Sequence, residues 1–591
     1  MFRSLARLKP YASRYRGRIT FGISLFLVAR LFEGSIPYFL KVGIDSIASG
    51  EGQILLPVAG IVVAVSLRFV TVSWARIAVR RSAYLLACDL RRDLYEHLQV
   101  MGPRFFGQYS IGDMMTRAIA DISLIQRLIS HGTTLLVIMV FATVVGFGYM
   151  LYLSPMLTLL ILPPLPFVFM YTFRASRQMG LASRQVQDRL SDLGAHVQEN
   201  LSGIRTIQAM VQEDIEIKRF ERTNQGYADA FYRHARITSL MSAVMPSMAA
   251  VCSVTILGVG GIMVLNGDIS IGDFTAFFLY VTMVVQPFRV AGMVVNMFQR
   301  AAVASDRLFE VFDRPPEIPD APQEGIPAHI RGDLEIRGLS FTYDKATTPA
   351  LADVSLAIAR GESISVMGRV GSGKSTLLKQ LVRIHDPEPG TVLIDGRDVR
   401  DYPLAQLRAQ VALVPQDPFL FGEPLRDNLT YDDPSRRLDR IWMAAESADL
   451  KDTIESMPEQ METVVGERGI TLSGGQKQRA TLARGLIRHS PVLVLDDCFS
   501  SVDTETEEHI LAELKRLRSG QTTIIVSHRV STARHSDRIV VLDEGRILEV
   551  GTHKELLEAG GFYAELERIQ REGADEADFE AAAATAAGAG G

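Results

Sequence analysis

Residues 368–375 and the aspartates Asp496 and Asp497 have the types and the order needed to bind a nucleoside triphosphate and cleave it. Residues 368–375 read GRVGSGKS, the P-loop pattern, and directly follow an apolar run that predicts a strand. Glycines let backbone N–H groups surround phosphate oxygens, and the helix that begins there adds partial positive charge. Lys374 is expected to reach the β- and γ-phosphates, and Ser375 is expected to bind Mg²⁺.

The two aspartates close a second apolar run, Val492 to Leu495, which predicts a buried strand. Asp496 is expected to share Mg²⁺ with Ser375. Asp497 follows at the position expected for a group that polarises the attacking water. Its side chain is one methylene shorter than that of glutamate, which bears on the rate of hydrolysis.

A third motif, LSGGQKQR at 472–479, resembles the signature motif of ATP-binding cassette (ABC) proteins. The resemblance covers almost the whole chain, because six predicted membrane spans are followed by one cassette, as in half-size type IV ABC exporters. Taken singly, residues such as Tyr343 and His528 have ordinary interpretations, as a strand-end aromatic and a lone polar residue. Their order and spacing together favour the family interpretation.

The resemblance implies a role for each matching residue. Tyr343 would stack on adenine, Gln416 would sense Mg²⁺ and the membrane domain, and Glu467 would touch a cytoplasmic helix tip. Ser473 to Gln476 would bind the γ-phosphate held by the other subunit, Asp503 would belong to the loop that joins the two sites, and His528 would contact the γ-phosphate. The expected catalytic residues are Asp497, His528 and Gln416, and the expected Mg²⁺ ligands are Ser375, Gln416 and Asp496. The expected nucleotide-binding residues are Tyr343, Gly368, Arg369, Val370, Gly371, Ser372, Gly373, Lys374, Ser375, Thr376, Ser473, Gly474, Gly475, Gln476 and Asp503.

Asp497 departs from the family pattern, which usually has glutamate there. The carboxylate is displaced by about 1.5 Å, one C–C bond. A misplacement near 1 Å costs on the order of 100-fold in rate, or about 2.7 kcal/mol of barrier. The sequence therefore predicts slow hydrolysis with good nucleotide retention, beside a fully competent signature. This pairing favours a heterodimer with a second half-transporter subunit, and a homodimer in which Asp497 serves twice is the alternative.

The length and composition place these motifs in a larger, partly membrane-embedded chain. With 591 residues, two or more domains are expected. Hydrophobic residues make up 47% and are concentrated before about residue 300. The net charge of −5 argues against nucleic acid as a partner. The three cysteines, Cys88, Cys252 and Cys498, form no CxxC pair, so neither a disulfide framework nor a zinc site is indicated.

Six segments are long and apolar enough to cross a lipid bilayer, at about 20–44, 54–77, 133–153, 156–173, 243–266 and 273–295. The connections 45–53, 153–155 and 267–272 lack Lys and Arg, which instead crowd 3–18, 76–117, 174–236 and the region after 300. The positive-inside rule then places both termini and the long loops in the cytoplasm, as expected of a multi-pass cell-membrane protein.

Two long connections, 78–132 and 174–242, show helical periodicity and predict helices that continue into the cytoplasm. Each has room for a short transverse helix that contacts the ATP-binding half, although simple extension of the bundle is an alternative. Within the membrane, Arg30 and Glu33 either neutralise each other or face substrate. Arg68 and Arg289 either snorkel or line a cavity, and Met241, Met245 and Met248 suggest packing more than a pocket.

The sequence thus predicts an all-α six-helix transmembrane domain joined to an α/β P-loop nucleotide-binding domain. The predicted parts are an amphipathic elbow helix (1–18), the transmembrane domain (19–312), a Pro-rich linker (313–331), the nucleotide-binding domain (332–572) and a disordered tail (573–591). The family resemblance implies ATP- and Mg²⁺-dependent export of a small amphipathic or hydrophobic compound by alternating access. An ATP-gated channel or regulator is the alternative from another class.

Overall fold

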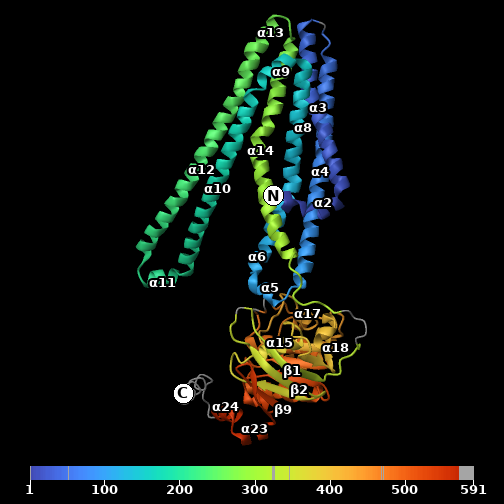
Figure 1. Cartoon of the computed structure of the whole chain (residues 1–591), viewed down its shortest axis with the longest axis vertical. Coiled ribbons are helices and arrows are strands. Elements are labelled where there is room, and N and C mark those ends of the chain that lie inside the picture. The colour runs from blue at the N-terminus through green and yellow to red at the C-terminus, as the bar shows by residue number, and fades with distance from the viewer. Residues whose placement is uncertain are drawn as a thin grey trace. The chain divides into compact units, whose positions relative to one another are not determined.

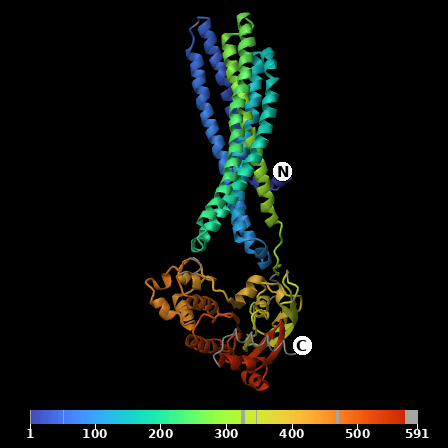
Figure 2. The same cartoon turned by 90° about the vertical axis from the view of Figure 1, so that its left-hand side faces the viewer.

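The computed structural model describes residues 2–571 apart from 51, 322–326, 345, 467, 468 and 470. It describes only the backbone of residues 164–169, 172, 173, 176, 245, 246, 248, 249 and 286–291. The predicted tail, Glu467 and the side chains of Arg289, Met245 and Met248 therefore lie outside the described residues. The chain divides into a helical unit, Met1–Val100 with Gln108–Pro315, and an α/β unit, Met101–Gly107 with Pro316–Gly591. Figures 1 and 2 show the elements of each.

Long helices build the helical unit because most of its sequence is apolar and contains few helix breakers. They are α3 (Arg16–Ala48), α4 (Leu55–Gln99), α8 (Thr133–Leu153), α10 (Pro164–Ser202), α12 (Glu213–Thr255) and α14 (Ile271–Phe312). Shorter elements are α1 (Phe2–Ala6), α2 (Lys9–Arg14), α6 (Ile111–Thr116), α7 (Ile122–Arg127), α9 (Pro155–Ile161), α11 (Ile204–Ala209), α13 (Gly261–Leu265) and the π-helical turns η1 (Arg117–Asp121), η2 (Leu128–Gly132) and η3 (Ile256–Gly260).

The predicted spans lie in these helices with two differences in detail. Among the described residues, three helical stretches are long and apolar enough to cross a membrane, Arg16–Ala48, Leu55–Gln99 and Ile111–Leu153; Ala250–Leu265 and Ile271–Val285 are shorter apolar helices. The segment 156–173 is two helices rather than one, because α9 ends at Ile161 and α10 begins at Pro164, after consecutive prolines that lack N–H donors. The predicted elbow helix is likewise two short helices, α1 and α2.

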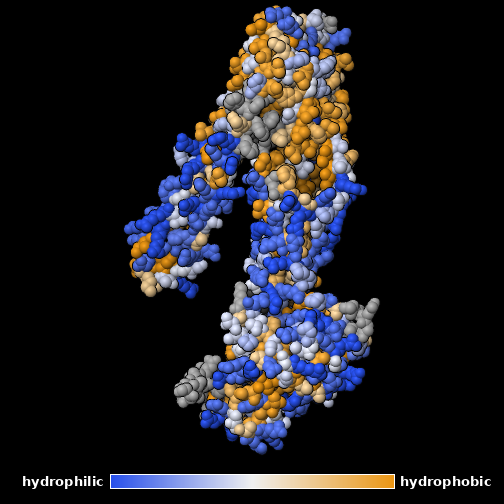
Figure 3. All heavy atoms as spheres, viewed as in Figure 1, coloured by the Kyte–Doolittle hydropathy of each residue, from blue (hydrophilic) through white to orange (hydrophobic). Residues whose placement is uncertain are grey.

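The helices extend well beyond a bilayer. At 1.5 Å per residue, the 45-residue α4 is about 68 Å long, more than twice the bilayer core of about 30 Å. In Figure 1, α10 and α12 lie side by side and are joined by the short α11. Figure 3 shows hydrophobic residues gathered over the upper part of the helical unit and hydrophilic ones over its lower part. The long connections are thus helical extensions, as the sequence predicts.

Small residues let the membrane helices approach closely. A Cβ on Gly34 of α3 would lie 2.7 Å from Val145 of α8, and one on Gly146 would lie 2.6 Å from Val284 of α14. The end of α3 is also tied to the start of α14, because Asp45 accepts hydrogen bonds from the Gly272 N–H and the Ser270 hydroxyl, both at 2.9 Å. Three helices are therefore held together without intervening bulky side chains.

The α/β unit contains two sheets. The larger has the order β10-β9-β3-β8-β7-β6, in which β9, β3, β8, β7 and β6 are parallel and β10 is antiparallel to β9. Its strands are β3 (Ser363–Met367), β6 (Val411–Val414), β7 (Val492–Asp496), β8 (Thr522–Val526), β9 (Arg538–Asp543) and β10 (Arg546–Gly551). The antiparallel sheet β2-β1-β4-β5 contains β1 (Leu334–Phe341), β2 (Leu351–Ile358), β4 (Val392–Ile394) and β5 (Arg397–Asp398).

Every residue of β7 and β8 is buried, as expected for near-continuous apolar strands in a parallel sheet covered on both faces. The helices of this unit are α15 (Lys374–Leu381), α16 (Leu404–Gln410), α17 (Leu425–Leu429), α18 (Leu438–Ser447), α19 (Lys451–Glu455), α20 (Gly474–Leu486), α21 (Thr504–Leu517), α22 (Val530–Ala533), α23 (His553–Ala559) and α24 (Phe562–Arg571). The helical transmembrane region followed by an α/β domain confirms the predicted fold class. Parallel β3, β8 and β7 bring their carboxyl ends to one edge, where ligands bind in such sheets.

One short helix of the predicted cytoplasmic loops is part of the α/β unit. This is α5 (Pro103–Gln108), of which residues up to Gly107 group with that unit. Arg104 pairs with Asp344 at 3.4 Å, and Glu317 of the Pro-rich linker accepts hydrogen bonds from the backbone N–H groups of Arg104 and Phe105, at 3.2 and 2.5 Å. The loop is thus fixed to the linker and to a residue of the α/β domain that follows it.

Candidate nucleotide-binding site

A cavity of about 410 Å³ opens at the carboxyl edge of β3, β7 and β8. Its walls combine the P-loop, the start of α15, the two aspartates at the end of β7, the last residue of β8 and four residues from the loops that follow β1, β6 and β8. The lining residues are Tyr343, Ala350, Val370, Gly371, Gly373, Lys374, Ser375, Thr376, Gln416, Asp496, Asp497, Val526 and His528. Residues from widely separated motifs of the sequence therefore meet in one place.

The P-loop fits closely over its neighbours, and two of its glycines cannot be replaced by a larger residue. Gly368 has φ +145°, and a Cβ there would lie 1.9 Å from the Leu542 carbonyl oxygen. Gly373 has φ +101°, and its Cβ would lie 2.3 Å from the Ala350 carbonyl oxygen. Helix α15 begins directly at Lys374, and Lys374, Ser375 and Thr376 of its first turn line the cavity. The N-terminus of a helix is a favourable place for phosphate groups.

Lys374 lies over the loop that precedes it. Its Nζ donates hydrogen bonds to the carbonyl oxygens of Gly368 and Arg369, each at 2.7 Å. The ammonium group is therefore held at the mouth of the loop, within reach of phosphate oxygens. Arg369 contributes its backbone here, whereas its guanidinium lies over the ring of Phe562 in α24, 5.4 Å from the ring centre.

Ser375 and Asp496 are paired as an Mg²⁺ site requires. The Ser375 hydroxyl donates to Asp496 Oδ1 at 2.9 Å. Burial raises the pKa of Asp496, and the Ser375 hydrogen bond and the nearby Lys379 oppose that rise. A hydroxyl and a carboxylate are hard oxygen donors of the kind that Mg²⁺ prefers, so these residues fit the ion. Mg²⁺ held between them would place positive charge beside the phosphate oxygens.

Asp497 gathers the other two expected catalytic residues around its carboxylate. One oxygen lies 3.1 Å from Nδ1 of His528, and the other accepts a hydrogen bond from Gln416 Nε2 at 3.3 Å. The backbone of Asp497 has φ +45°, a left-handed conformation unusual for a non-glycine residue, and its N–H donates to the Val526 carbonyl oxygen at 3.0 Å. The turn that follows β7 therefore aims this side chain into the cavity, 14% exposed.

Tyr343 lines the cavity beside the first turn of α15. Its hydroxyl lies 3.0 Å from the Thr376 hydroxyl, and its ring meets Phe341 and His385 edge to face. This aromatic group leaves the exposed ring of Tyr343 available for stacking on a base. Burial lowers the pKa of His385, and nearby cations reinforce the shift.

The signature motif forms the start of a different helix. Ser473 caps α20 through a reciprocal pair of hydrogen bonds with Gln476, and Gln478 then binds Ser500 and the Ser501 N–H, each at 2.8 Å. Asp503 caps α21 by accepting from the Thr506 N–H at 2.9 Å. Among the described residues that line the cavity, none comes from 473–476 and none is Asp503. The structure thus separates the signature from the P-loop of its own chain.

Comparisons with known proteins agree with this arrangement. The transmembrane region of ABC transporters matches residues 19–288, and the ABC transporter ATP-binding domain matches residues 351–500. The uncharacterized ABC transporter ATP-binding protein YknU of Bacillus subtilis (strain 168) is 33% identical over 95% of this chain and 97% of its own length. The chain belongs to the ABC transporter family.

Other relatives are of exporter type. The putative multidrug export ATP-binding/permease protein YgaD of Bacillus subtilis (strain 168) is 31% identical over 96% of this chain and 99% of its own length. The ATP-dependent lipid A-core flippase of Burkholderia orbicola (strain AU 1054) is 31% identical over 96% and 95%. A solved bacterial Atm1-family ABC exporter with ATP bound has a TM-score of 0.75 at 26% identity, covering 95% of this chain and 99% of that one. The chain is therefore a half-size ABC exporter, with an ATPase coupled to transport.

Some contacts of this ABC exporter's site have no signal in the sequence motifs. His385 beside Tyr343 belongs to no motif. Gln478 lies inside the signature motif, and its contact with the loop before Asp503 follows from the fold.

In the helical unit, Arg30 and Glu33 form an ion pair, and Arg68 contacts the same carboxylate at 3.1 Å. The mutual neutralisation of Arg30 and Glu33 is thus present in the structure.

Proposed function

We propose that this half-size exporter uses ATP to move amphipathic or hydrophobic compounds out across the cell membrane by alternating access. It works as one half of a heterodimer, and its own Asp497 site hydrolyses ATP slowly. The compound class comes from the relatives, whose names include multidrug export and a lipid A-core flippase.

One observation carries the two-chain proposal. The P-loop cavity and the signature at the start of α20 are parts of one site, yet they are separate in this chain. A second cassette must therefore supply the missing half of each site. ABC half-transporters dimerise, and the proposal adds the identity of the partner: a subunit with glutamate at the position of Asp497.

The geometry of the site supports a proposed role for each residue. The P-loop N–H groups and Lys374 hold the phosphates, and Ser375 with Asp496 would hold Mg²⁺. Asp497 accepts a hydrogen bond from the attacking water and orients it, while Gln416 and His528 fix the position of its carboxylate. ATP bound in the cavity supplies the phosphoryl group and the binding energy that closes the two cassettes.

The Asp497 carboxylate contacts Gln416 and His528, and its side chain is shorter than that of glutamate by one C–C bond, about 1.5 Å. Nucleotide binding does not depend on it, since Lys374, Ser375 and Asp496 are in place. The chain therefore retains its ATP, and Ser473 to Gln476 complete the faster site of the partner.

The test compares the purified chain alone with the chain co-expressed with a candidate half-transporter subunit that has glutamate at the position of Asp497. We expect a stable complex, with ATPase activity and ATP-dependent uptake of a fluorescent amphiphile into inside-out vesicles far above those of the single chain. Lys374→Ala in this chain should remove ATP binding at its own site and stop transport. Rapid ATP turnover by the chain alone, as a dimer of itself, would refute the heterodimer, and transport that persists in the Lys374→Ala variant would refute the role of this site.

A further inference from the structure

Three adjoining cavities lie between helices α10 and α14 of the helical unit, with α7 and η1 beside them. Their volumes are about 400, 410 and 660 Å³, and Gly180 and Asn296 line all three. Arginines reach them from three helices. We define the basic groove by these residues: Arg127, Arg177, Arg184, Arg300 and Arg307.

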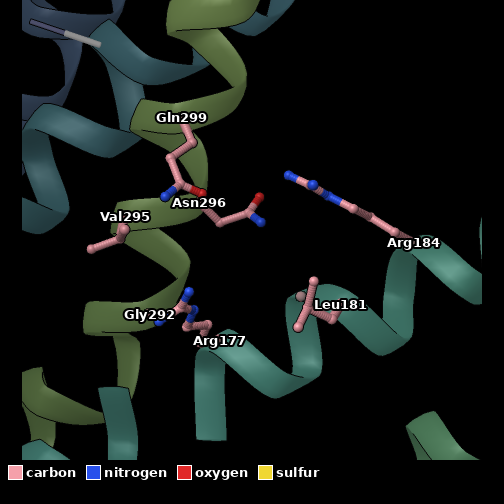
Figure 4. Close-up of a pocket in the computed structure, with 8 residues that line it drawn as sticks. Arg177, Leu181, Arg184, Gly292, Val295, Asn296 and Gln299 are labelled. Carbon is pink, nitrogen blue, oxygen red and sulfur yellow. The ribbon is translucent and has the colours of Figure 1, made fainter. Parts of the chain in front are cut away.

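Helical spacing explains why the arginines face one space. Along α10 the lining residues stand at positions i, i+3, i+4 and i+7, which share one helix face: Arg177, Gly180, Leu181 and Arg184. On α14 the same spacing relates the lining residues Gly292, Val295, Asn296, Gln299 and Arg300. Figure 4 shows Arg184 reaching from α10 toward Asn296 and Gln299 on α14. A Cβ on Gly180 would meet nothing within 4 Å, so open space lies beside this position.

The positive charge of the groove is not balanced from within. Asp121 is the one carboxylate among the residues that line these cavities, and Arg307 already pairs with it at 3.5 Å. Arg307 also pairs with Asp113 at 3.0 Å, and Arg127 donates to the Ser123 carbonyl oxygen. Within the described part of the chain, no ion pair or hydrogen bond is formed by the guanidinium groups of Arg177, Arg184 and Arg300. Three guanidinium groups are therefore available to a ligand.

Apolar side chains alternate with the arginines. Leu124, Met179, Leu181, Met293, Val295 and Met297 line the same cavities. The groove lies where the fourth and sixth predicted spans, 156–173 and 273–295, continue into the cytoplasmic extensions of α10 and α14. The groove therefore begins just beyond the ends of these predicted spans. It offers charged and apolar side chains next to each other, which matches the two parts of an amphiphile.

We propose that the basic groove binds the anionic headgroup, phosphate or carboxylate, of an amphipathic substrate whose apolar part lies against the neighbouring leucine, valine and methionine side chains. Planar guanidinium groups suit this task because they hold phosphate and carboxylate oxygens through paired hydrogen bonds. The proposal rests on the proposed export function and narrows its substrate class to anionic amphiphiles. It also assigns Arg177, Arg184 and Arg300 to substrate selection.

The test measures binding to the full-length protein, with its partner if the pair is obligate, in nanodiscs of zwitterionic lipid. The probes are a fluorescent phosphatidic acid and a fluorescent phosphatidylcholine with the same chains, and the variants are Arg177→Gln, Arg184→Gln and Arg300→Gln. Each substitution should weaken phosphatidic acid binding about tenfold, since a hydrogen bond to a charged group is worth roughly that factor. Phosphatidylcholine binding should not change.

Two matched variants separate groove binding from general attraction. Arg174→Gln removes an exposed arginine of the same helix that does not line the cavities, and it should leave phosphatidic acid affinity unchanged. Arg184→Lys keeps the charge but loses the paired geometry, so it should bind between wild type and Arg184→Gln. Equal losses in Arg174→Gln and the groove variants would overturn the proposal, because the effect would then be surface charge alone.

The source of the anion is tested by competition. Inorganic phosphate should displace the fluorescent phosphatidic acid only at concentrations far above those of a soluble short-chain phosphatidic acid. Equal potency would overturn the amphiphile assignment. Failure of the proposed export function would be seen in a separate measurement, as the absence of ATP-dependent uptake of both lipids into vesicles. The difference in lipid binding between wild type and the groove variants is measured without ATP, so it does not depend on transport.

Discussion

Replacing Asp497 with glutamate should convert a slow ATPase site into a fast one. The substitution adds one methylene and moves the carboxylate by about 1.5 Å. In the structure the Asp497 carboxylate lies 3.1 Å from His528 Nδ1 and 3.3 Å from Gln416 Nε2. A longer side chain on the same backbone, held in its left-handed turn by the bond to Val526, carries the carboxylate past these two groups into the cavity.

The size of the effect follows from positioning alone. If a displacement near 1 Å costs about 100-fold in rate, recovering it lowers the barrier by about 2.7 kcal/mol. We therefore expect Asp497→Glu to raise the ATP turnover of this site by about 10- to 100-fold. Nucleotide affinity should stay the same, because Lys374, Ser375 and Asp496 are untouched. Asp497→Asn is the matched control: it keeps the size and removes the charge, so the residual activity should fall.

The assay is single-turnover hydrolysis of radiolabelled ATP by the purified complex, with equilibrium binding of a fluorescent ATP analogue measured in parallel. An unchanged or lower rate in Asp497→Glu, with normal binding, would refute the argument that carboxylate position limits this site. A wild-type rate equal to that of the glutamate variant would refute it equally. An Asp497→Asn rate as high as wild type would show that Asp497 does not orient the water.

Three further predictions concern other parts of the chain. Gly475→Ala would place a Cβ 2.7 Å from the Ser501 carbonyl oxygen, so we expect it to displace the signature motif. The ATPase activity of the complex should fall about 100-fold, while ATP binding persists. Normal ATP turnover would contradict this. Burial lowers the pKa of His385 in the folded protein, so protonation below a pH of about 6.5 favours the unfolded chain. The Tm of His385→Gln should therefore fall less than the Tm of wild type when the pH is lowered from 7.5 to 5.5. Equal falls in Tm would contradict this. Gly272→Ala would place a Cβ 2.5 Å from Asp45 Oδ1 and break the hydrogen bond between α3 and α14, so we expect the free energy of unfolding to fall by about 1–3 kcal/mol. The measurement is a thermal melt, and the control is Gly261→Ala, whose Cβ would meet nothing within 4 Å. Equal Tm values for the two variants would contradict the argument.

The chemistry of the site was predictable because it rests on short motifs with fixed mechanics. A P-loop after a strand and an aspartate after a parallel strand must reach the same sheet edge, so the contact between Ser375 and Asp496 follows from topology. The family resemblance named Asp497, Gln416 and His528 as catalytic residues without predicting contacts among them, and the structure brings the three side chains together. Assignment of roles to them stays a prediction.

Other features depend on packing that local sequence does not encode. The break between α9 and α10 is marked by Pro163 and Pro164, but hydropathy alone continues through it. His385 reaches Tyr343 only because β1 and α15 place them side by side. The basic groove is equally non-local. Its arginines come from three helices that are far apart in the sequence, and the sequence alone shows them only as positive-inside charge.

The grouping of residues 101–107 with the α/β unit has a mechanical consequence. Three peptide bonds cross the boundary between the two units, Val100–Met101, Gly107–Gln108 and Pro315–Pro316. Because α4 ends at Gln99 and α6 begins at Ile111, any rotation of the ATP-binding unit pulls on both helices through the backbone itself. Side-chain contacts such as Arg104 with Asp344 set the stiffness of this linkage, while its existence is covalent. Substitution of Arg104 or Asp344, both within the α/β unit, should therefore loosen the coupling between ATP use and transport without severing it.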